Sequence, residues 1–98
     1  MKAIFIAYNQ AYYLEIADIL KEKFGVNGFT LWQNIMGTGS TDGEPHMGSH
    51  AWPVQNDSIL TIVEDEKVRP ILETIEEIDK ATPALGLRAF AWSISDMY

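Results

Sequence analysis

The chain has 98 residues, a formal net charge of −7 at pH 7 and no cysteine. This length suits one domain with one hydrophobic core, so we expect a single domain over residues 1–98. The negative charge argues against a nucleic-acid partner, because phosphate binding needs a basic surface. The lack of cysteine excludes disulfides and thiolate metal sites and fits a cytoplasmic protein. No window approaches the roughly 18 apolar residues of a membrane span, so we expect no membrane insertion.

The first third of the chain predicts a strand, a helix and a second strand. Residues 2–8, KAIFIAY, are apolar and are followed by Asn9, which is typical of a short buried strand. Apolar residues then recur at helical spacing over 13–24, with Asn9 as the N-cap and Gly25 at the end of the helix. Residues 28–36, GFTLWQNIM, predict the second strand.

The second half of the chain repeats this pattern after a long loop. Residues 58–63, SILTIV, are apolar and rich in β-branched side chains, so they predict a third strand. The segment that follows predicts an amphipathic helix with Val68, Ile71, Leu72, Ile75 and Ile78 on one face. Since Pro70 is tolerated only near a first turn, we expect this helix to begin near residues 66–67. Residues 87–94, LRAFAWSI, predict a fourth strand.

The order β-α-β-β-α-β predicts a ferredoxin-like α+β sandwich, in which a four-stranded antiparallel sheet carries both helices on one face. The other face would be polar if it met water, but the first and last strands are apolar on both faces. The residues concerned are Ala3, Ile4, Phe5, Ile6, Ala7, Tyr8, Leu87, Ala89, Phe90, Ala91, Trp92 and Ile94. We therefore expect further copies of the chain to cover the second face. The alternative is that the long loop folds back over it.

The long loop spans residues 35–57, IMGTGSTDGEPHMGSHAWPVQND, and holds both histidines of the chain. His46 and His50 stand four residues apart, with the carboxylates of Asp42, Glu44 and Asp57 nearby in the sequence. A set of two histidines and a carboxylate suits zinc or a similar divalent ion. The alternative is that both histidines are exposed on a mobile segment. The glycines and the proline around them make a helix improbable, so the spacing alone does not define a metal site.

Neither phosphate-loop nor catalytic motifs accompany this loop. Gly37, Gly39 and Gly43 would let backbone N–H groups approach an anion, but no Gly-Lys-Ser/Thr follows, so this is not a P-loop. No Ser/His/Asp arrangement is supported. Glu64 and Asp65 are adjacent and would point to opposite faces of a strand. We therefore expect no enzymatic activity.

The element order, the long loop and the second apolar sheet face together resemble the PII family of signalling proteins, of the nitrogen regulatory protein P-II type. The residues that carry the resemblance are Gly28-Phe29-Thr30 at the second strand, Gly37-Thr38-Gly39 at the loop base and the run SILTIVEDEKV before the second helix. The resemblance covers nearly the whole chain. The chain is also similar to divergent PII-like proteins associated with heavy-metal efflux systems.

The resemblance implies a homotrimer in which three sheets pack their open faces together. It implies that residues 38–56 form a T-loop, which contacts partner proteins that are usually membrane transporters or enzymes. It also implies a ligand cleft between subunits near the loop base, where family members often bind ATP, ADP or AMP. The ligand-binding positions that it implies are Thr30, Gly37, Gly39, Thr82, Gly86 and Arg88.

The chain departs from the family at three points. Classical members carry a Gly-Asp-Gly-Lys run after the second helix, whereas residues 82–88 here read TPALGLR, of which only Thr82, Gly86 and Arg88 can replace it. The basic tail that holds phosphates and the tyrosine that some members modify are also missing. We therefore do not expect tight binding of a nucleoside triphosphate, because few cations face many phosphate charges. The histidines of the loop shift the expected effector toward a metal ion.

Three functions remain open at this stage. The first is a trimeric PII-like regulator that binds an adenine nucleotide or a divalent metal ion and controls a partner, such as a transporter, through its T-loop. The second is a CutA-like metal-binding trimer that acts in metal tolerance. The third is a small dimeric α+β barrel enzyme, which needs a cavity between the helices and the sheet with a histidine or carboxylate inside. Neither histidine lies on a predicted strand or helix, so the enzyme ranks last.

Overall fold

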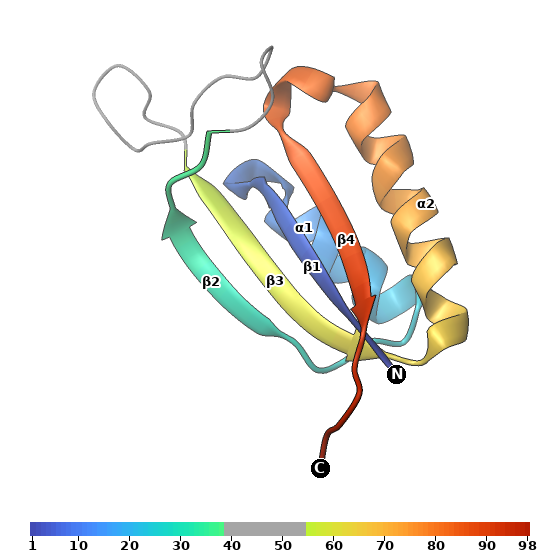
Figure 1. Ribbon diagram of the computed structural model, residues 1–98. Helices are drawn as coiled ribbons and strands as arrows, with labels where there is room; N and C mark the ends of the chain where they lie inside the picture. The colour runs from blue at the N-terminus through green and yellow to red at the C-terminus, as the bar shows by residue number, and fades with distance from the viewer. Residues whose placement is uncertain (39–54) are drawn as a thin grey trace.

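A computed structural model of the chain, which describes residues 1–38 and 55–98, shows one antiparallel sheet with two helices on one side (Figure 1). The strands follow the order β2-β3-β1-β4 across the sheet, and all three neighbouring pairs are antiparallel. The elements are β1 (Lys2–Asn9), a 3-10 turn (Gln10–Tyr12), α1 (Tyr13–Asp18) continued by a π-helical segment (Ile19–Lys23), β2 (Thr30–Ile35), β3 (Asn56–Val63), α2 (Asp65–Ala81), a 3-10 turn (Pro83–Leu85) and β4 (Leu87–Ser93). The predicted ferredoxin-like βαββαβ fold is confirmed.

The helix boundaries follow the predicted signals, with two differences. The Asn9 side chain accepts a hydrogen bond from the Ala11 N–H at 2.9 Å, and Gly25 has the positive φ of +66° that ends a helix without strain. However, the first helical region is not one regular α-helix, because it begins as a 3-10 turn and ends in a π-helical segment. Helix α2 begins at Asp65, slightly earlier than predicted, so the exposed Pro70 stands inside the helix rather than in its first turn.

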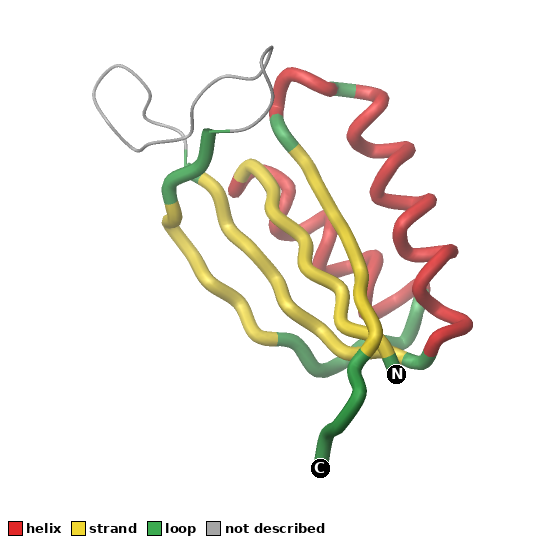
Figure 2. Tube along the Cα trace, viewed as in Figure 1, coloured by secondary structure: helices red, strands yellow, loops and turns green. Residues whose placement is uncertain are grey.

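The hydrophobic core lies between the sheet and the two helices. Both helices lie behind the same face of the sheet (Figure 2). The largest fully buried apolar side chains are Ile4, Ile6, Tyr8, Ile16, Leu20, Ile59 and Ile71. The apolar side chains of the strands and of the helices therefore pack against each other in one layer, which buries the helix-facing side of the sheet. In the described ranges, no helix is both long and apolar enough to cross a membrane.

The opposite face of the sheet carries a band of large apolar side chains. Strand register places Phe5 beside Leu60 on β3 and Phe90 on β4. The Phe5 and Phe90 rings lie 5.5 Å apart between centroids, and the Phe90 and Trp92 rings lie 6.3 Å apart. Phe90 is 54% exposed and Trp92 is 46% exposed. The prediction that both faces of these strands are apolar is thus confirmed, and we call this surface the open face.

Candidate functional site

The two ends of the long loop meet at one end of the sheet, where Asn34 connects them by hydrogen bonds (Figure 1). The Asn34 backbone N–H donates to Asp57 Oδ1 at 3.0 Å, and Gln55 Nε2 donates to the Asn34 carbonyl at 3.3 Å. Gln10 Nε2 donates to Asn34 Oδ1 at 3.1 Å, while the Gln10 backbone N–H donates to the Gln55 carbonyl at 3.1 Å. The loop base is therefore joined to the turn between β1 and α1.

The backbone at this loop base has an unusual local geometry. Strand β2 is irregular between Trp32 and Ile35, and Asn34 has a φ of +57°. Asparagine adopts this left-handed conformation more readily than most residues, which explains its presence at the irregularity. At Gly37, an added Cβ would collide with the side-chain amide of Asn56. The conformation of Asn34 and the missing side chain of Gly37 let the two ends of the loop approach each other closely.

A buried polar pair lies beneath the loop base. Tyr8 and Asp57 stand opposite each other in the β1–β3 register, and they are 0% and 3% exposed. No hydrogen-bond partner of the Tyr8 hydroxyl is found in residues 1–38 and 55–98. Burial, followed by the Asp57 carboxylate and then Tyr13, raises the pKa of Tyr8 well above its ordinary value. Tyr8 is therefore neutral near pH 7 and is a poor proton acceptor.

Replacing Tyr8 by Phe is expected to leave stability unchanged or to raise it by up to about 1 kcal/mol, because the lost hydroxyl is buried without a described partner. Tyr12→Phe is the matched control and is expected to cost about 1 kcal/mol, since the Tyr12 hydroxyl bonds Thr82 Oγ1 at 2.6 Å. Urea unfolding at one protein concentration measures both. Equal losses in the two variants would show that Tyr8 also has a hydrogen-bond partner.

The turn between α2 and β4 is fixed to the same end of β1. Besides the bond between Tyr12 and Thr82, the Asn9 backbone N–H donates to the Gly86 carbonyl at 3.1 Å. Gly86 has a φ of +84°, which favours glycine at this position. Arg88 follows on β4 and is exposed. Its guanidinium makes no hydrogen bond or ion pair with any described residue.

One row of residues crosses the open face at the loop end of the sheet. The register pairs Trp32 with Ser58, Ser58 with Ala7, and Ala7 with Arg88. We call these four residues the loop-end row. Neighbouring strands lie about 4.8 Å apart, so the two outer strands of this sheet are separated by about 14 Å. The row therefore carries an indole at one edge, a cation at the other and only small side chains between them.

The structure divides the predicted ligand-binding residues into two groups. Thr30 and Gly37 belong to the β2 edge, where Thr30 is exposed and pairs with Leu60. Thr82, Gly86 and Arg88 belong to the β4 edge. Within the chain these groups occupy opposite edges of the sheet, so a ligand that contacts both within one copy must cross the loop-end row.

The predicted metal ligands His46 and His50, and the predicted ligand-binding Gly39, lie outside the described residues. Within the described ranges, no group of three or more His, Cys, Asp or Glu could hold a metal ion. Asp57 is the carboxylate of the predicted metal-binding set that lies within the described residues. In the described structure Asp57 is buried and accepts a hydrogen bond from the Asn34 N–H, which holds the loop base.

Sequence reasoning missed the hydrogen-bonding role of Gln10, Asn34 and Gln55. One signal was available, because Gln33 and Asn34 interrupt an otherwise apolar strand segment. Polar residues in a strand often mark an irregularity or a strand end. The partners of Asn34 could not be found this way, because they come from segments distant in sequence.

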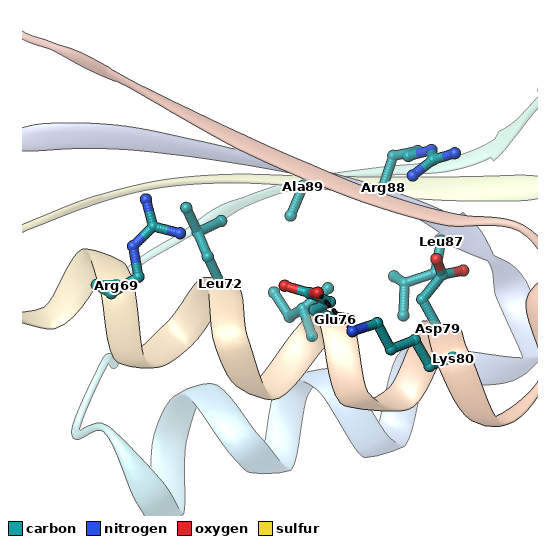
Figure 3. Close-up of a pocket in the computed structure, with 9 residues that line it drawn as sticks. Arg69, Leu72, Glu76, Asp79, Lys80, Leu87, Arg88 and Ala89 are labelled. Atoms are coloured by element: carbon teal, nitrogen blue, oxygen red, sulfur yellow. Dashed lines mark ion pairs between the residues drawn. The ribbon is translucent and has the colours of Figure 1, made fainter.

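A cavity of about 340 Å³ lies between α2 and β4. Its lining residues are Arg69, Leu72, Ile75, Glu76, Asp79, Lys80, Leu87, Arg88 and Ala89. Figure 3 shows the Arg88 side chain pointing away from α2, whereas Glu76 and Lys80 form an ion pair along the helix at 2.8 Å. The hydrogen bond from Lys80 holds the pKa of Glu76 below its ordinary value. The ion pair with Lys80 weakens Glu76 as a proton acceptor, and Asp79 is the second carboxylate that lines the cavity.

Comparison with known families places the whole chain in one group. The family described as nitrogen regulatory protein P-II matches residues 1–98. No curated protein matches the chain.

Solved structures give the same result. The chain is similar to CPII from Thiomonas intermedia K12 bound to ADP and bicarbonate, with 25% identity, a TM-score of 0.74 and coverage of 93% of this chain and 82% of that chain. A structure of CPII bound to ADP, AMP and bicarbonate matches with 25% identity, a TM-score of 0.73 and coverage of 95% and 88%. A PII-like signalling protein from Thermus thermophilus shares the fold, with 23% identity, a TM-score of 0.66 and coverage of 93% and 83%.

Proposed function

The chain belongs to the nitrogen regulatory protein P-II family, and from this membership we propose that it is a regulator that binds an adenine nucleotide and controls a partner through its T-loop. The predicted resemblance is confirmed. Proteins of this family are generally non-enzymatic signalling proteins, and they are typically trimers that interact with partner proteins. For this chain, a single domain, a cytoplasmic location and the lack of catalysis are parts of the proposal.

The open face supports a homotrimer. Phe90 and Trp92 on β4 and Ile62 on β3 are each more than two-fifths exposed, and β1 lies between these two strands, with its Ala3 paired to both Ile62 and Trp92. A contiguous apolar surface of this kind marks an interaction site in soluble proteins. Three copies that pack these faces together would bury the aromatic band and leave the helices outside.

The Arg88 guanidinium at the loop end of the open face, which has no partner among the described residues, is the observation that carries the ligand proposal. In a chain of net charge −7, an exposed cation without a described partner is suited to an anionic ligand. The CPII structures hold ADP, AMP and bicarbonate. We extend the adenine-nucleotide class to this chain, with mono- and diphosphates favoured over triphosphates because one arginine balances few phosphate charges.

The hydrogen bonds at the loop base would connect the proposed ligand site to the T-loop. Trp32 of the loop-end row lies two residues before Asn34, whose hydrogen bonds reach Asp57, Gln10 and Gln55. A ligand that orders β2 at this point therefore acts on the residues that hold both ends of the loop. Order–disorder changes of such a segment are a known way to control a partner, and a transporter is the kind of partner that we propose.

Thermal unfolding in the presence of AMP, ADP, ATP, bicarbonate or Zn²⁺ tests the proposal. A ligand that binds only the folded protein adds about 2.7 kcal/mol of stability at one hundred times its Kd. We expect AMP and ADP to stabilise more than ATP, and pyrophosphate serves as the control for charge alone. Hydrogen exchange over residues 40–55 should slow when the nucleotide is bound. If no adenine nucleotide stabilises the protein, the proposal is wrong, whereas stabilisation by Zn²⁺ alone would favour the metal-binding hypothesis for His46 and His50.

A further inference from the structure

Trp32 is the exposed aromatic residue of the loop-end row and stands apart from the aromatic band of the open face. It is 45% exposed. The aromatic ring contacts among the described residues join Phe5 to Phe90 and Phe90 to Trp92, and neither involves Trp32. Its direct partner in the sheet is Ser58, whose small side chain cannot cover an indole. The band therefore does not explain why a large aromatic side chain occupies this position.

The rest of the row suits a flat ligand with an anionic end. Ser58 and Ala7 place no large side chain between Trp32 and Arg88. Side chains directly opposite one another in antiparallel strands point to the same face, so the indole and the guanidinium lie on one side of the sheet. The outer strands lie about 14 Å apart, so a ligand on this row meets Trp32 at one end and Arg88 at the other.

We propose that Trp32 is the base-binding platform of this site, on which adenine stacks while the phosphate meets Arg88. This inference rests on the proposed function and adds the residue that recognises the base. Bases stack on aromatic side chains because both present a π-face, and such a stack typically contributes about tenfold or more to affinity. Trp32 directly precedes the irregularity of β2, and Asn34, two residues further on, donates its backbone N–H to Asp57.

Two apolar substitutions of Trp32 distinguish stacking of the base on the side chain from simple apolar packing at this position. Trp32→Phe keeps an aromatic ring, whereas Trp32→Leu keeps apolar bulk without a π-face. Calorimetric titration of each full-length variant with AMP and with ribose 5-phosphate measures the contribution of the base. We expect Trp32→Leu to weaken AMP binding about tenfold and Trp32→Phe to weaken it less than about threefold. Ribose 5-phosphate should bind all three proteins equally, and light scattering should give them one mass.

The outcomes of this test show separately whether Trp32 binds the base and whether the protein binds an adenine nucleotide at all. Equal AMP affinity in Trp32→Phe and Trp32→Leu at unchanged mass would overturn the platform while leaving nucleotide binding intact. Loss of assembly in both variants, with AMP affinity lost equally, would make Trp32 a subunit contact and would also overturn the platform. If wild-type protein binds no adenine nucleotide, the proposed function itself fails. Quenching of tryptophan emission by AMP in wild type, absent in Trp32→Phe despite retained binding, would support direct stacking.

Discussion

Phe90→Glu is expected to convert the assembled protein into monomers of 11.0 kDa. Phe90 is 54% exposed in the single chain and lies at the centre of the aromatic band, with Phe5 and Trp92 on either side. If three open faces pack together, the substitution places three carboxylates in one apolar interface. An unpaired buried charge costs several kcal/mol, which exceeds what small changes in packing can offset. Light scattering after size exclusion measures the mass directly.

Leu14→Glu is the matched control for this experiment. Leu14 is an apolar residue that is 73% exposed on α1, in the helical layer away from the open face. The substitution introduces the same charge, and we expect the mass of this variant to equal that of the wild type. Circular dichroism must show that both variants fold. If folded Phe90→Glu retains the wild-type mass, the open face is not the subunit interface, and the proposed trimer needs another surface.

Arg88→Ala is expected to weaken AMP binding by about tenfold or more, because a hydrogen bond to a charged partner typically contributes about 1.5–3 kcal/mol. The guanidinium has no described partner within the chain, so its removal should change stability little. Adenosine, which has no phosphate, should bind the variant as well as it binds the wild type. Titration calorimetry with AMP and with adenosine distinguishes the phosphate contact from the base contact.

Arg69→Ala is the control for this second prediction. Arg69 lines the cavity between α2 and β4, on the helix side of the strand that carries Arg88. If the ligand occupies the loop-end row, Arg69→Ala should bind AMP with wild-type affinity. A loss in Arg69→Ala together with normal binding in Arg88→Ala would place the nucleotide in the cavity instead. Such a result would contradict the site that we propose while leaving nucleotide binding in place.

Much of the fold could be predicted because the signals that define it are local. Each strand has a short apolar run, Asn9 and Gly25 mark the ends of the first helical region, and the order of elements selects one sheet topology. The apolar character of both faces of β1 and β4 could also be read directly, because side chains alternate along a strand. The alternation alone therefore predicts an apolar second face of the sheet.

The candidate site was harder to predict because its members come from different segments. Asp57 belongs to a loop-like polar stretch in the sequence, yet pairing with β1 buries it opposite Tyr8. Arg88 was identified through the family resemblance, but its position in one row with Trp32 depends on the register of three strand pairs. Residues 39–54, which hold His46 and His50, lie outside what the structure describes, so their metal-binding role stays a prediction.

For this protein, the sequence alone determined the element order, the helix-facing core and the apolar second face of the sheet, because periodicity and capping act over a few neighbouring residues. Only the tertiary structure decided which residues share the loop end. One shift in register would move a strand's side chains to the other face, and the irregularity after Trp32 redirects β2 at the point where the loop begins. Cross-strand neighbours follow from pairing between distant segments, and this pairing brings Trp32, Ser58, Ala7 and Arg88 into one row.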